Sequence, residues 1–403
     1  MHDTVTDHKE KQKLLLKNKK KQVLQEIVNK IDTELASQGI TYTRIGKIWG
    51  ISTSGVSDVF SGKREISLCY LAKTLVFLYE DHRKRQLTLE RYLDVAKPEN
   101  SREAMEYLSL RGEFELLKNL IVKESCSDTE ENANWALVYD LIHLKSQGGI
   151  GPQDYHEKLE DMKEENQNPE MQILIGILMC YTSYQLGDYR LLTKRMKKLE
   201  KKASRIKNKF IRKCHTVRIK EGLASIKLTS DELQEVRKTC DDVLELCEDE
   251  PHLLISKARA YWLKAESFIF DDYKQSLMYF NEALEILNDN INLEIIKKKQ
   301  AILKTIQFLK IYHNRDLDTL GVLEKGERAF YEIRVGNLDQ AIEILKAIEN
   351  KNGELSSFQL VYLGMATNNR EFIKQGLRKF EETSSLFYAR FAKKNWVLFE
   401  KTV

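Results

Sequence analysis

The sequence predicts an all-α fold, in which an N-terminal helix-turn-helix domain precedes an α-solenoid of the tetratricopeptide type. Only four prolines and eighteen glycines interrupt 403 residues, and 31% of the residues are charged, a composition that favours long helices. Alternating strand-like runs joined by Asn-Gly turns are missing. Because a chain of this length exceeds one compact core, we expect two or more domains.

The first segment, residues 1–21, is interpreted as a basic tail. It contains the run KEKQKLLLKNKKK from Lys9 to Lys21. Residues 1–85 hold sixteen Lys and Arg against ten Asp and Glu, whereas the whole chain is nearly balanced at 65 against 61. This local excess is the electrostatic footprint expected of a duplex-binding protein. A solvated, frayed tail is an equally good interpretation of residues 1–20.

Residues 22–90 are predicted to form a DNA-binding helix-turn-helix domain. The prediction rests on YTRIGKIWGISTSGVSDVFS, from Tyr42 to Ser61, whose small and apolar residues have the spacing of that motif. Ile45, Ile48 and Trp49 follow the three-and-four spacing of a helix with one buried face. A helical hairpin within a larger core is the alternative.

Three small residues define the turn of this motif. Gly46 allows a close approach of the second helix, and Gly50 can adopt the positive φ that ends a helix. Ser52 is placed to cap the helix that follows. We expect the second helix to bury Val56 and Val59, and to present its polar residues to a major groove.

None of these outward helix residues is Arg, Asn or Gln, so direct base readout is expected to be sparse and binding to depend on phosphates. A further helix from about Ser67 to Arg85 is expected to close the domain, with the charged cluster at 82–85 as a boundary or linker. The candidate DNA-binding residues are Lys47, Thr53, Ser54, Ser57, Asp58, Lys63 and Arg64.

Residues 91–380 repeat an apolar helix, a tight turn and a second helix. Turn signals recur at Gly112, Gly187, Asp271 and Gly336, at separations close to two units of a repeat of roughly 34 to 40 residues. Such hairpins stack into a solenoid with a concave wall. That wall suits an extended peptide or a helix, although repeats alone also fit a large partner protein or a second copy of the chain.

The final segment, residues 381–403, is expected to cap the solenoid and to contact a second subunit. Its large apolar side chains form a set too large to leave in water. We expect both roles to be combined. The candidate dimer contacts are Phe387, Phe391, Trp396 and Phe399.

No catalytic constellation is present, which argues against an enzyme. The sequence contains no phosphate loop, no GxGxxG, no HExxH and no GxSxG, and its eight histidines are scattered. We expect no cofactor and no metal. The six cysteines show no CxxC spacing and are interpreted as free thiols in a reducing compartment. With no apolar run approaching roughly 20 residues and no signal peptide, a cytoplasmic protein without membrane contact is predicted.

Several segments carry a resemblance to a known family. CYTSYQLGDYRLLTKRMKKLE (180–200) and NKFIRKCHTVRIKEGLASIKLTSDELQEVRK (208–238) are similar to the central repeats of the arbitrium receptors, the AimR family of phage lysis-lysogeny regulators. Residues 92–121 resemble that family's first repeat, and LFYARFAKKNWVLF (386–399) resembles its capping region. The order of these segments, spread over most of the chain, is what identifies the resemblance.

The resemblance implies a homodimeric regulator in the cytoplasm of a bacterial host cell. Such a regulator binds double-stranded DNA when free of ligand, and a short secreted signalling peptide of hexapeptide size lowers productive DNA binding. The peptide must then favour one arrangement of the two DNA-binding heads over the other.

The resemblance also implies peptide-binding positions. The family's amide positions fall on Ser225, Thr229 and Glu266, all departures from Asn. Lys257 or Arg259 replaces the basic anchor for the peptide's carboxylate, Glu327 retains one acid, and Ser385 occupies another acidic position with Arg390 nearby. Because of the departures, a regulator that ignores peptides stays open, as does a protein-interaction scaffold of the tetratricopeptide type.

Overall fold

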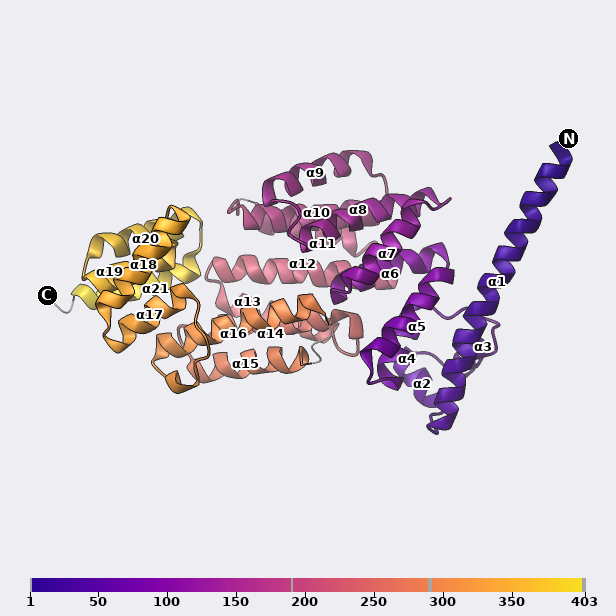
Figure 1. The fold of residues 1–403 in the computed structure, drawn as a ribbon, viewed down its shortest axis with the longest axis horizontal. Helices are drawn as coiled ribbons and strands as arrows, with labels where there is room; N and C mark the ends of the chain where they lie inside the picture. The colour runs from indigo at the N-terminus through magenta and orange to yellow at the C-terminus, as the bar shows by residue number, and fades with distance from the viewer. Residues whose placement is uncertain (1, 190, 289–291, 401–403) are drawn as a thin grey trace.

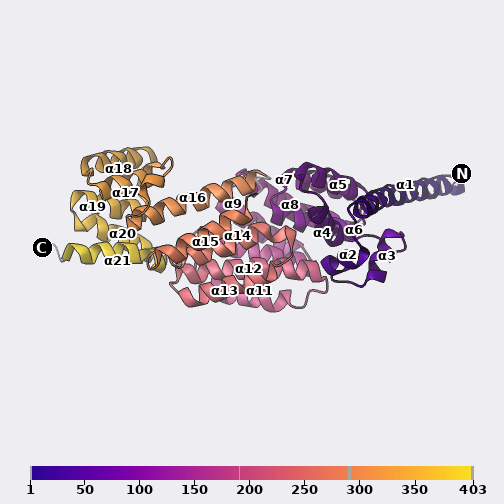
Figure 2. The same cartoon turned by 90° about the horizontal axis from the view of Figure 1, so that it is seen from below.

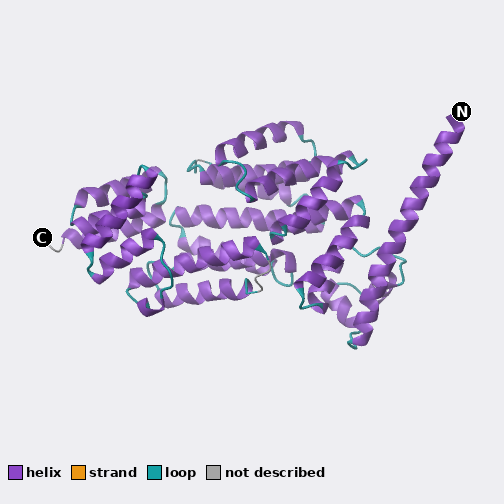
Figure 3. Cartoon of the chain, in the orientation of Figure 1, coloured by secondary structure: helices purple, strands orange, loops and turns teal. Residues whose placement is uncertain are grey.

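The computed structural model describes residues 2–189, 191–288 and 292–400, with side chains from residue 14 to 397 apart from residues 16, 190 and 289–291. Over these residues the chain forms α-helices, two short 3-10 helices and no strand, which confirms the all-α prediction (Figure 3). The molecule is elongated and its two termini lie at opposite ends (Figure 1).

Five helices form the N-terminal head. The first, α1, is a single helix of 36 residues whose N-terminal part projects away from the rest of the chain, while its C-terminal part packs in the head (Figure 1). The sequence between residues 2 and 37 contains neither Gly nor Pro, so nothing interrupts the helix at the expected limit of the tail near residue 21. The head consists of α1 (His2–Ser37), α2 (Tyr42–Trp49), α3 (Thr53–Phe60), α4 (Leu68–Leu78) and α5 (His82–Val95).

The predicted single helix from Ser67 to Arg85 is wrong, because the chain turns between α4 and α5. Tyr79 is extended, with φ −122° and ψ 118°. Asp81 caps the next helix, since its carboxylate accepts a 2.8 Å hydrogen bond from the backbone N–H of Arg83. The charged cluster is therefore the first turn of α5 and not a linker, and α5 continues past residue 90.

Antiparallel hairpins follow the head and stack side by side. Two helices stand outside the pairs: α16 (Leu293–His313) and α21 (Leu386–Glu400), while short 3-10 helices cover Pro251–Leu253 (η1) and Leu317–Thr319 (η2). The pairs are α6 (Pro98–Arg111) with α7 (Phe114–Ser125), α8 (Glu130–Ser146) with α9 (Pro152–Glu165), α10 (Pro169–Gln185) with α11 (Leu192–Ala203), α12 (Lys209–Thr229) with α13 (Leu233–Leu246), α14 (Leu254–Glu266) with α15 (Tyr273–Ile286), α17 (Lys325–Val335) with α18 (Leu338–Asn352), and α19 (Ser357–Thr367) with α20 (Arg370–Glu382).

The four turn signals read from the sequence all lie between paired helices. Gly112 and Gly336 end α6 and α17 in the left-handed region, with φ of 69° and 88°. The predicted separation of two repeat units is correct for the intervals from Gly112 to Gly187 and from Gly187 to Asp271. It is wrong for the third, because a single helix of 21 residues, α16, separates α15 from α17 and leads to the C-terminal hairpins (Figure 2).

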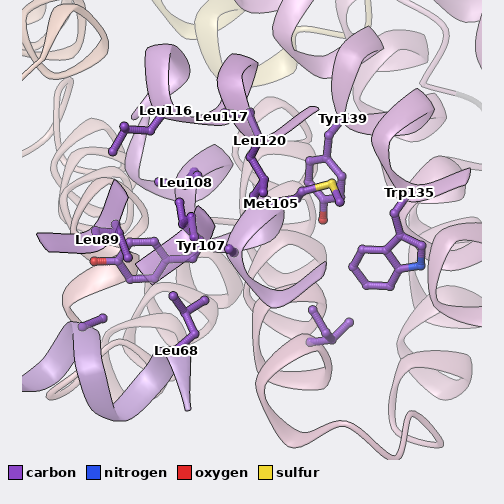
Figure 4. Packing of buried hydrophobic residues seen from close by; sticks show 14 of the residues in the cluster. Leu68, Leu89, Met105, Tyr107, Leu108, Leu116, Leu117, Leu120, Trp135 and Tyr139 are labelled. Atoms are coloured by element: carbon purple, nitrogen blue, oxygen red, sulfur yellow. The ribbon is translucent and has the colours of Figure 1, made fainter. Parts of the chain in front are cut away.

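The head and the solenoid share a continuous hydrophobic core. Leu68 of α4 and Leu89 of α5 point toward Tyr107 and Leu108 of α6 (Figure 4). A second core fills the C-terminal half, and α12 belongs to both: Leu223 packs in the first and Leu228 in the second. Because buried apolar contacts cross from the head into the solenoid, the two are joined by packing rather than by a linker.

The C-terminal segment caps the solenoid, as predicted. The rings of Phe387 and Phe391 are 0% and 1% exposed. They therefore cannot contact a second subunit directly, because their own chain already covers them. Trp396 is half-buried beside the Arg370 guanidinium, at 5.5 Å from the ring centroid, and the side chain of Phe399 lies outside the described residues.

All six cysteines are free thiols. Four are buried, whereas Cys126 is exposed. Across the described helices, none combines the length and the apolar character that crossing a membrane requires.

Candidate nucleic-acid interface and ligand cavities

Helices α2 and α3 adopt the turn that the sequence predicts. The N–H of Gly50, at φ 71°, bonds back to the carbonyls of Gly46 and Lys47 and closes α2. A Cβ on Gly46 would lie 2.8 Å from the carbonyl oxygen of Ile51, so only glycine fits there. The Ser52 hydroxyl caps α3 by accepting a 3.2 Å bond from the N–H of Gly55.

A small aromatic core fixes this motif to the rest of the head. The rings of Tyr42 and Trp49 stack on Phe60, at centroid distances of 5.1 and 5.7 Å. The Trp49 indole N–H also donates a 2.8 Å hydrogen bond to the Thr74 hydroxyl of α4. The orientation of α3 is therefore set by packing on both neighbouring helices.

The predicted DNA-binding residues lie on the surface of this motif. Asp58 is half-exposed, and its carboxylate lies 3.7 Å from the ammonium group of Lys63. This pairing reduces the repulsion that an acid on α3 would exert on phosphates. The other five, which are exposed, are Lys47, Thr53, Ser54, Ser57 and Arg64.

A cavity of about 750 Å³ lies between the end of α14, α16 and the C-terminal hairpins. We call it the C-terminal cavity. Aromatic rings from four different helices or loops line it, together with the carboxyl groups of Glu266 and Glu327. The aromatic lining residues are Phe270, Phe308, Phe358, Tyr362 and Tyr388.

Burial perturbs both carboxyl groups of this cavity. It raises the pKa of Glu266 to about 7, against the opposing charge of Arg259. Burial also raises the pKa of Glu327. Neither group has an ion-pair partner within the described part of the chain. Two carboxyl groups that form no ion pair among the described residues, in a cavity lined by aromatic rings, are suited to receive a cationic ligand group.

A second cavity, of about 320 Å³, lies between α6, α10, α12, α14 and α16, and we call it the central cavity. Its polar groups include Glu221, Ser225 and Arg259. The Arg259 guanidinium donates a 3.1 Å hydrogen bond to the Ser225 hydroxyl. Burial raises the pKa of Glu221, whereas the charge of Arg259 lowers it.

Helix α14 connects the two cavities. Arg259 lines the central cavity and Glu266 lines the C-terminal cavity. Seven residues separate them, which places both side chains on one face of α14, about 10 Å apart along the axis. A ligand that lies along this face therefore meets a cation at one end and a carboxyl group at the other.

Four predicted peptide-binding residues line neither cavity: Thr229, Lys257, Ser385 and Arg390. Arg390 is a structural clamp instead. Its guanidinium forms a two-point contact with Asp271, at 2.8 and 3.1 Å, and lies 3.7 Å from Asp231. It thereby ties α21 to the loops that follow α14 and α12.

Thr229 is 3% exposed, and its hydroxyl donates to the carbonyl of Ile226 one turn earlier. It lines neither cavity. The sequence prediction missed Tyr388 and Glu221, which do. Tyr388 follows Phe387, a residue taken for a dimer contact, and Glu221 lies one turn before Ser225. Helical spacing around the residues already selected was the available signal.

Glu250, just before α14, contacts both the head and the solenoid. Its carboxylate contacts the ammonium groups of Lys213 of α12 at 2.7 Å and Lys73 of α4 at 3.3 Å. The Arg111 guanidinium of α6 also donates a 2.5 Å bond to the Pro251 carbonyl. The start of α14 is therefore held by charged contacts from the head and from two solenoid helices.

Comparison with known proteins identifies relatives over most of the chain. The profile of the AimR transcriptional regulator-like family matches residues 84–395. An uncharacterized Bacillus anthracis protein is 31% identical over 247 residues, which cover 61% of this chain and 92% of that protein. The AimR transcriptional regulator of Bacillus phage phi3T is 21% identical over 322 residues, 79% of this chain and 82% of that one.

Two solved structures have a similar fold. The structure of selenomethionine phAimR gives a TM-score of 0.70 at 18% identity, covering 93% of this chain and 99% of that chain. The phAimR–ligand structure gives 0.68 at 19% identity, covering 83% and 98%. This chain thus shares its fold with these structures over the lengths covered.

Proposed function

This chain belongs to the AimR transcriptional regulator-like family, and we propose that it binds promoter DNA as a homodimer under the control of a short secreted peptide. The peptide lies in the solenoid and reduces productive DNA binding. The regulator acts in the cytoplasm of a bacterial host cell, in an arbitrium-type decision between lysis and lysogeny.

The face of α14 that carries Arg259 and Glu266 is the main support for a peptide ligand. Arg259 is the anchor for the peptide's C-terminal carboxylate, and Ser225 orients its guanidinium through the 3.1 Å hydrogen bond. Glu266 and Glu327 receive a cationic side chain or the amino terminus. Because an extended residue spans about 3.3 Å, roughly three residues bridge Arg259 and Glu266, and the other residues of a hexapeptide extend past Glu266 into the C-terminal cavity that Glu327 also lines.

The exposed polar face of α3 supports DNA as the second ligand. In a helix-turn-helix the second helix enters the major groove, where Thr53, Ser54 and Ser57 can make single hydrogen bonds to base edges. Lys47, Lys63 and Arg64 contact the flanking phosphates. Two such heads in a dimer read two half-sites, so their separation must match that of the operator.

The contacts of Glu250 provide a physical connection between the two sites. A peptide that repositions α14 also moves Glu250. The contact between the Glu250 carboxylate and the ammonium group of Lys73 then changes, and with it the position of α4. Because Trp49 bonds to Thr74 on α4, that movement reaches the helix-turn-helix. The peptide lowers DNA affinity only if it binds the altered arrangement better than the original one.

The homodimer is proposed to use the exposed side of α21. With Phe387 and Phe391 enclosed, the remaining candidates there are Trp396 and its neighbour Val397, which is 47% exposed.

Calorimetry with candidate peptides encoded beside the gene tests peptide binding. We expect Arg259→Gln and Glu327→Gln each to weaken binding by at least tenfold. Lys257→Gln and Glu343→Gln are matched controls, because Lys257 lies on the same helix as Arg259 without lining a cavity and Glu343 is an exposed acid of α18. Promoter binding without binding of any such peptide would instead indicate a peptide-independent regulator.

A further inference from the structure

A third cavity, of about 560 Å³, lies in the head beside the helix-turn-helix. Its walls come from α1, from the end of α3 with the loop that follows, and from the junction between α5 and α6. Leu24, Val28, Val59 and Ile66 form an apolar floor. We call it the head cavity.

The rim of the head cavity is strongly basic. Lys97 lies 2.9 Å from Glu65, which is the one acid among the described residues that line the cavity, and Lys63 lies near Asp58. The remaining basic side chains have no ion-pair partner among the residues that the structure describes. These unpaired cations are Lys17, Lys20, Lys21 and Arg64. A concave site with several uncompensated cations binds a polyanion more readily than any neutral ligand.

The spacing of residues along α1 places two of its lysines on the helix face that lines the head cavity. Lys17, Lys21, Leu24 and Val28 follow intervals of four, three and four residues and share one face of α1. The apolar end of that face packs in the head, and its basic end forms the rim. Lys19 lies on the opposite face and does not line the cavity.

The loop after α3 is fixed against α1 by close packing. Gly62 has φ +74°, and a Cβ there would clash with the amide oxygen of Gln25 on α1. The Gln25 side chain also donates a 3.4 Å hydrogen bond to the carbonyl of Phe60. Lys63 and Arg64 are therefore held beside the lysines of α1, so the cations of both segments form one surface.

We propose that the head cavity binds phosphates of the DNA backbone, with α1 as a clamp beside the groove that α3 enters. Helix α3 has 8 residues, or about 12 Å, which matches the width of about 12 Å of the major groove. In a helix-turn-helix the N-terminal residues of the second helix contact the base edges, so its C-terminal end and the loop after it lie toward the phosphates at the edge of the groove. The cavity begins at that end, because Val59 is one of its lining residues.

This inference rests on the proposed DNA binding and extends it to a second element outside the helix-turn-helix. Phosphate contacts carry no sequence information, so α1 supplies affinity while the bases are read by α3. This division compensates for an α3 surface without Arg, Asn or Gln.

The test compares two double variants of the full chain that remove the same charge from α1. Lys17→Gln with Lys21→Gln removes cations from the rim, and Lys19→Gln with Lys30→Gln removes them from the opposite face. DNA affinity is measured across salt concentrations, on promoter DNA and on an unrelated duplex. We expect the rim variant to lower the salt slope by about 1.8, at 0.9 per lost phosphate contact, equally on both DNAs.

The control variant is expected to keep the slope of the unaltered chain. An unchanged slope in the rim variant, or an equal loss in both variants, would overturn the inference and leave the proposed DNA binding intact. Tight binding of inorganic phosphate with an unchanged slope would overturn it in favour of a free anion. If the unaltered chain binds no promoter DNA, the proposed function itself fails.

Discussion

Arg218 and Glu106 form a buried two-point ion pair that joins α12 to α6. The guanidinium Nε lies 2.8 Å from Oε1 of Glu106, and Nη2 lies 3.0 Å from Oε2. Glu106 is fully buried, and the Tyr139 hydroxyl of α8 donates a further 2.7 Å bond to it. The carboxylate of Glu106 thereby joins three solenoid helices near the head, α6, α8 and α12.

Removing this carboxylate is expected to destabilise the protein strongly. Glu106→Gln leaves the buried charge of Arg218 without its partner, which costs about 3–5 kcal/mol of unfolding free energy. Glu26→Gln, which breaks an exposed pair with Arg91, is the control, with an expected cost of about 0–1 kcal/mol. Urea unfolding measures both. Equal losses in the two variants would show that burial of the Glu106 pair is unimportant.

The buried carboxyl groups give the protein opposite responses to pH. Burial raises the pKa of Glu266 from 4.5 to about 7. Between these values the unfolded chain has released the proton that the folded chain keeps, so the contribution of Glu266 to stability falls as pH rises through this window. We expect Glu266→Gln to remove this decline in urea midpoints measured from pH 5 to 8. If the urea midpoints of the unaltered chain and of Glu266→Gln changed with pH in the same way, the raised pKa of Glu266 would be contradicted.

Burial would raise the pKa of Glu106 as well, but the Arg218 charge holds that pKa well below its usual range. The unfolded chain therefore binds the proton first as pH falls, and the stability from this pair is lost on acidification below about pH 4.5. Urea midpoints measured below pH 4.5 in the unaltered chain and in Glu106→Gln separate this effect from that of Glu266, which is expected at higher pH.

The turn of the helix-turn-helix depends on glycine at position 46. Gly46→Ala places a methyl group against the Ile51 carbonyl and is expected to cost about 1–3 kcal/mol locally. Hydrogen exchange of residues 42–60 should accelerate, and DNA binding should weaken. Gly326→Ala is the control, since its nearest neighbour is the amide of Gln359 at 3.4 Å. Unchanged exchange in the first variant would contradict the close approach.

The dimer contact is expected on the outer side of α21. Val397→Asp should shift the protein to monomers in analytical ultracentrifugation, whereas Val335→Asp, at a site 42% exposed on α17, should not. Phe391→Ala should instead lower stability by about 3–5 kcal/mol, because the ring fills the core. A dimer that survives Val397→Asp would place the subunit contact on another surface.

Coupling between the cavities and the head is expected to depend on Lys73. Lys73→Gln removes the contact between α4 and Glu250, and should reduce the effect of peptide on DNA affinity while leaving peptide affinity unchanged. Lys84→Gln, which removes a 3.0 Å pair with Glu34 inside the head, is the matched control. Anisotropy titrations with labelled DNA measure both. Full coupling in the Lys73 variant would exclude this contact as the connection.

The fold was predictable where local chemistry decides it. Gly46, Gly50 and Ser52 determine the turn of the helix-turn-helix without help from distant residues, and the turn glycines of the hairpins do the same. The break at Tyr79 was not predictable from apolar spacing, since the charged residues after it suit a helix as well as a linker.

The cavities were only partly predictable, because they depend on which helices meet. Arg259, Ser225, Glu266 and Glu327 were selected through resemblance and do line them. Arg390 was selected by proximity in sequence, yet its guanidinium reaches two aspartates that lie far away along the chain. A long-range ion pair of this kind leaves no signal in the local pattern.

The central claim is that a peptide in the solenoid changes DNA binding by the head. The most direct test measures promoter affinity with and without saturating peptide, and peptide affinity with and without saturating DNA. We predict that each ligand weakens the other by the same factor, tenfold or more, as linkage requires. Saturating peptide that leaves promoter affinity unchanged would contradict the account.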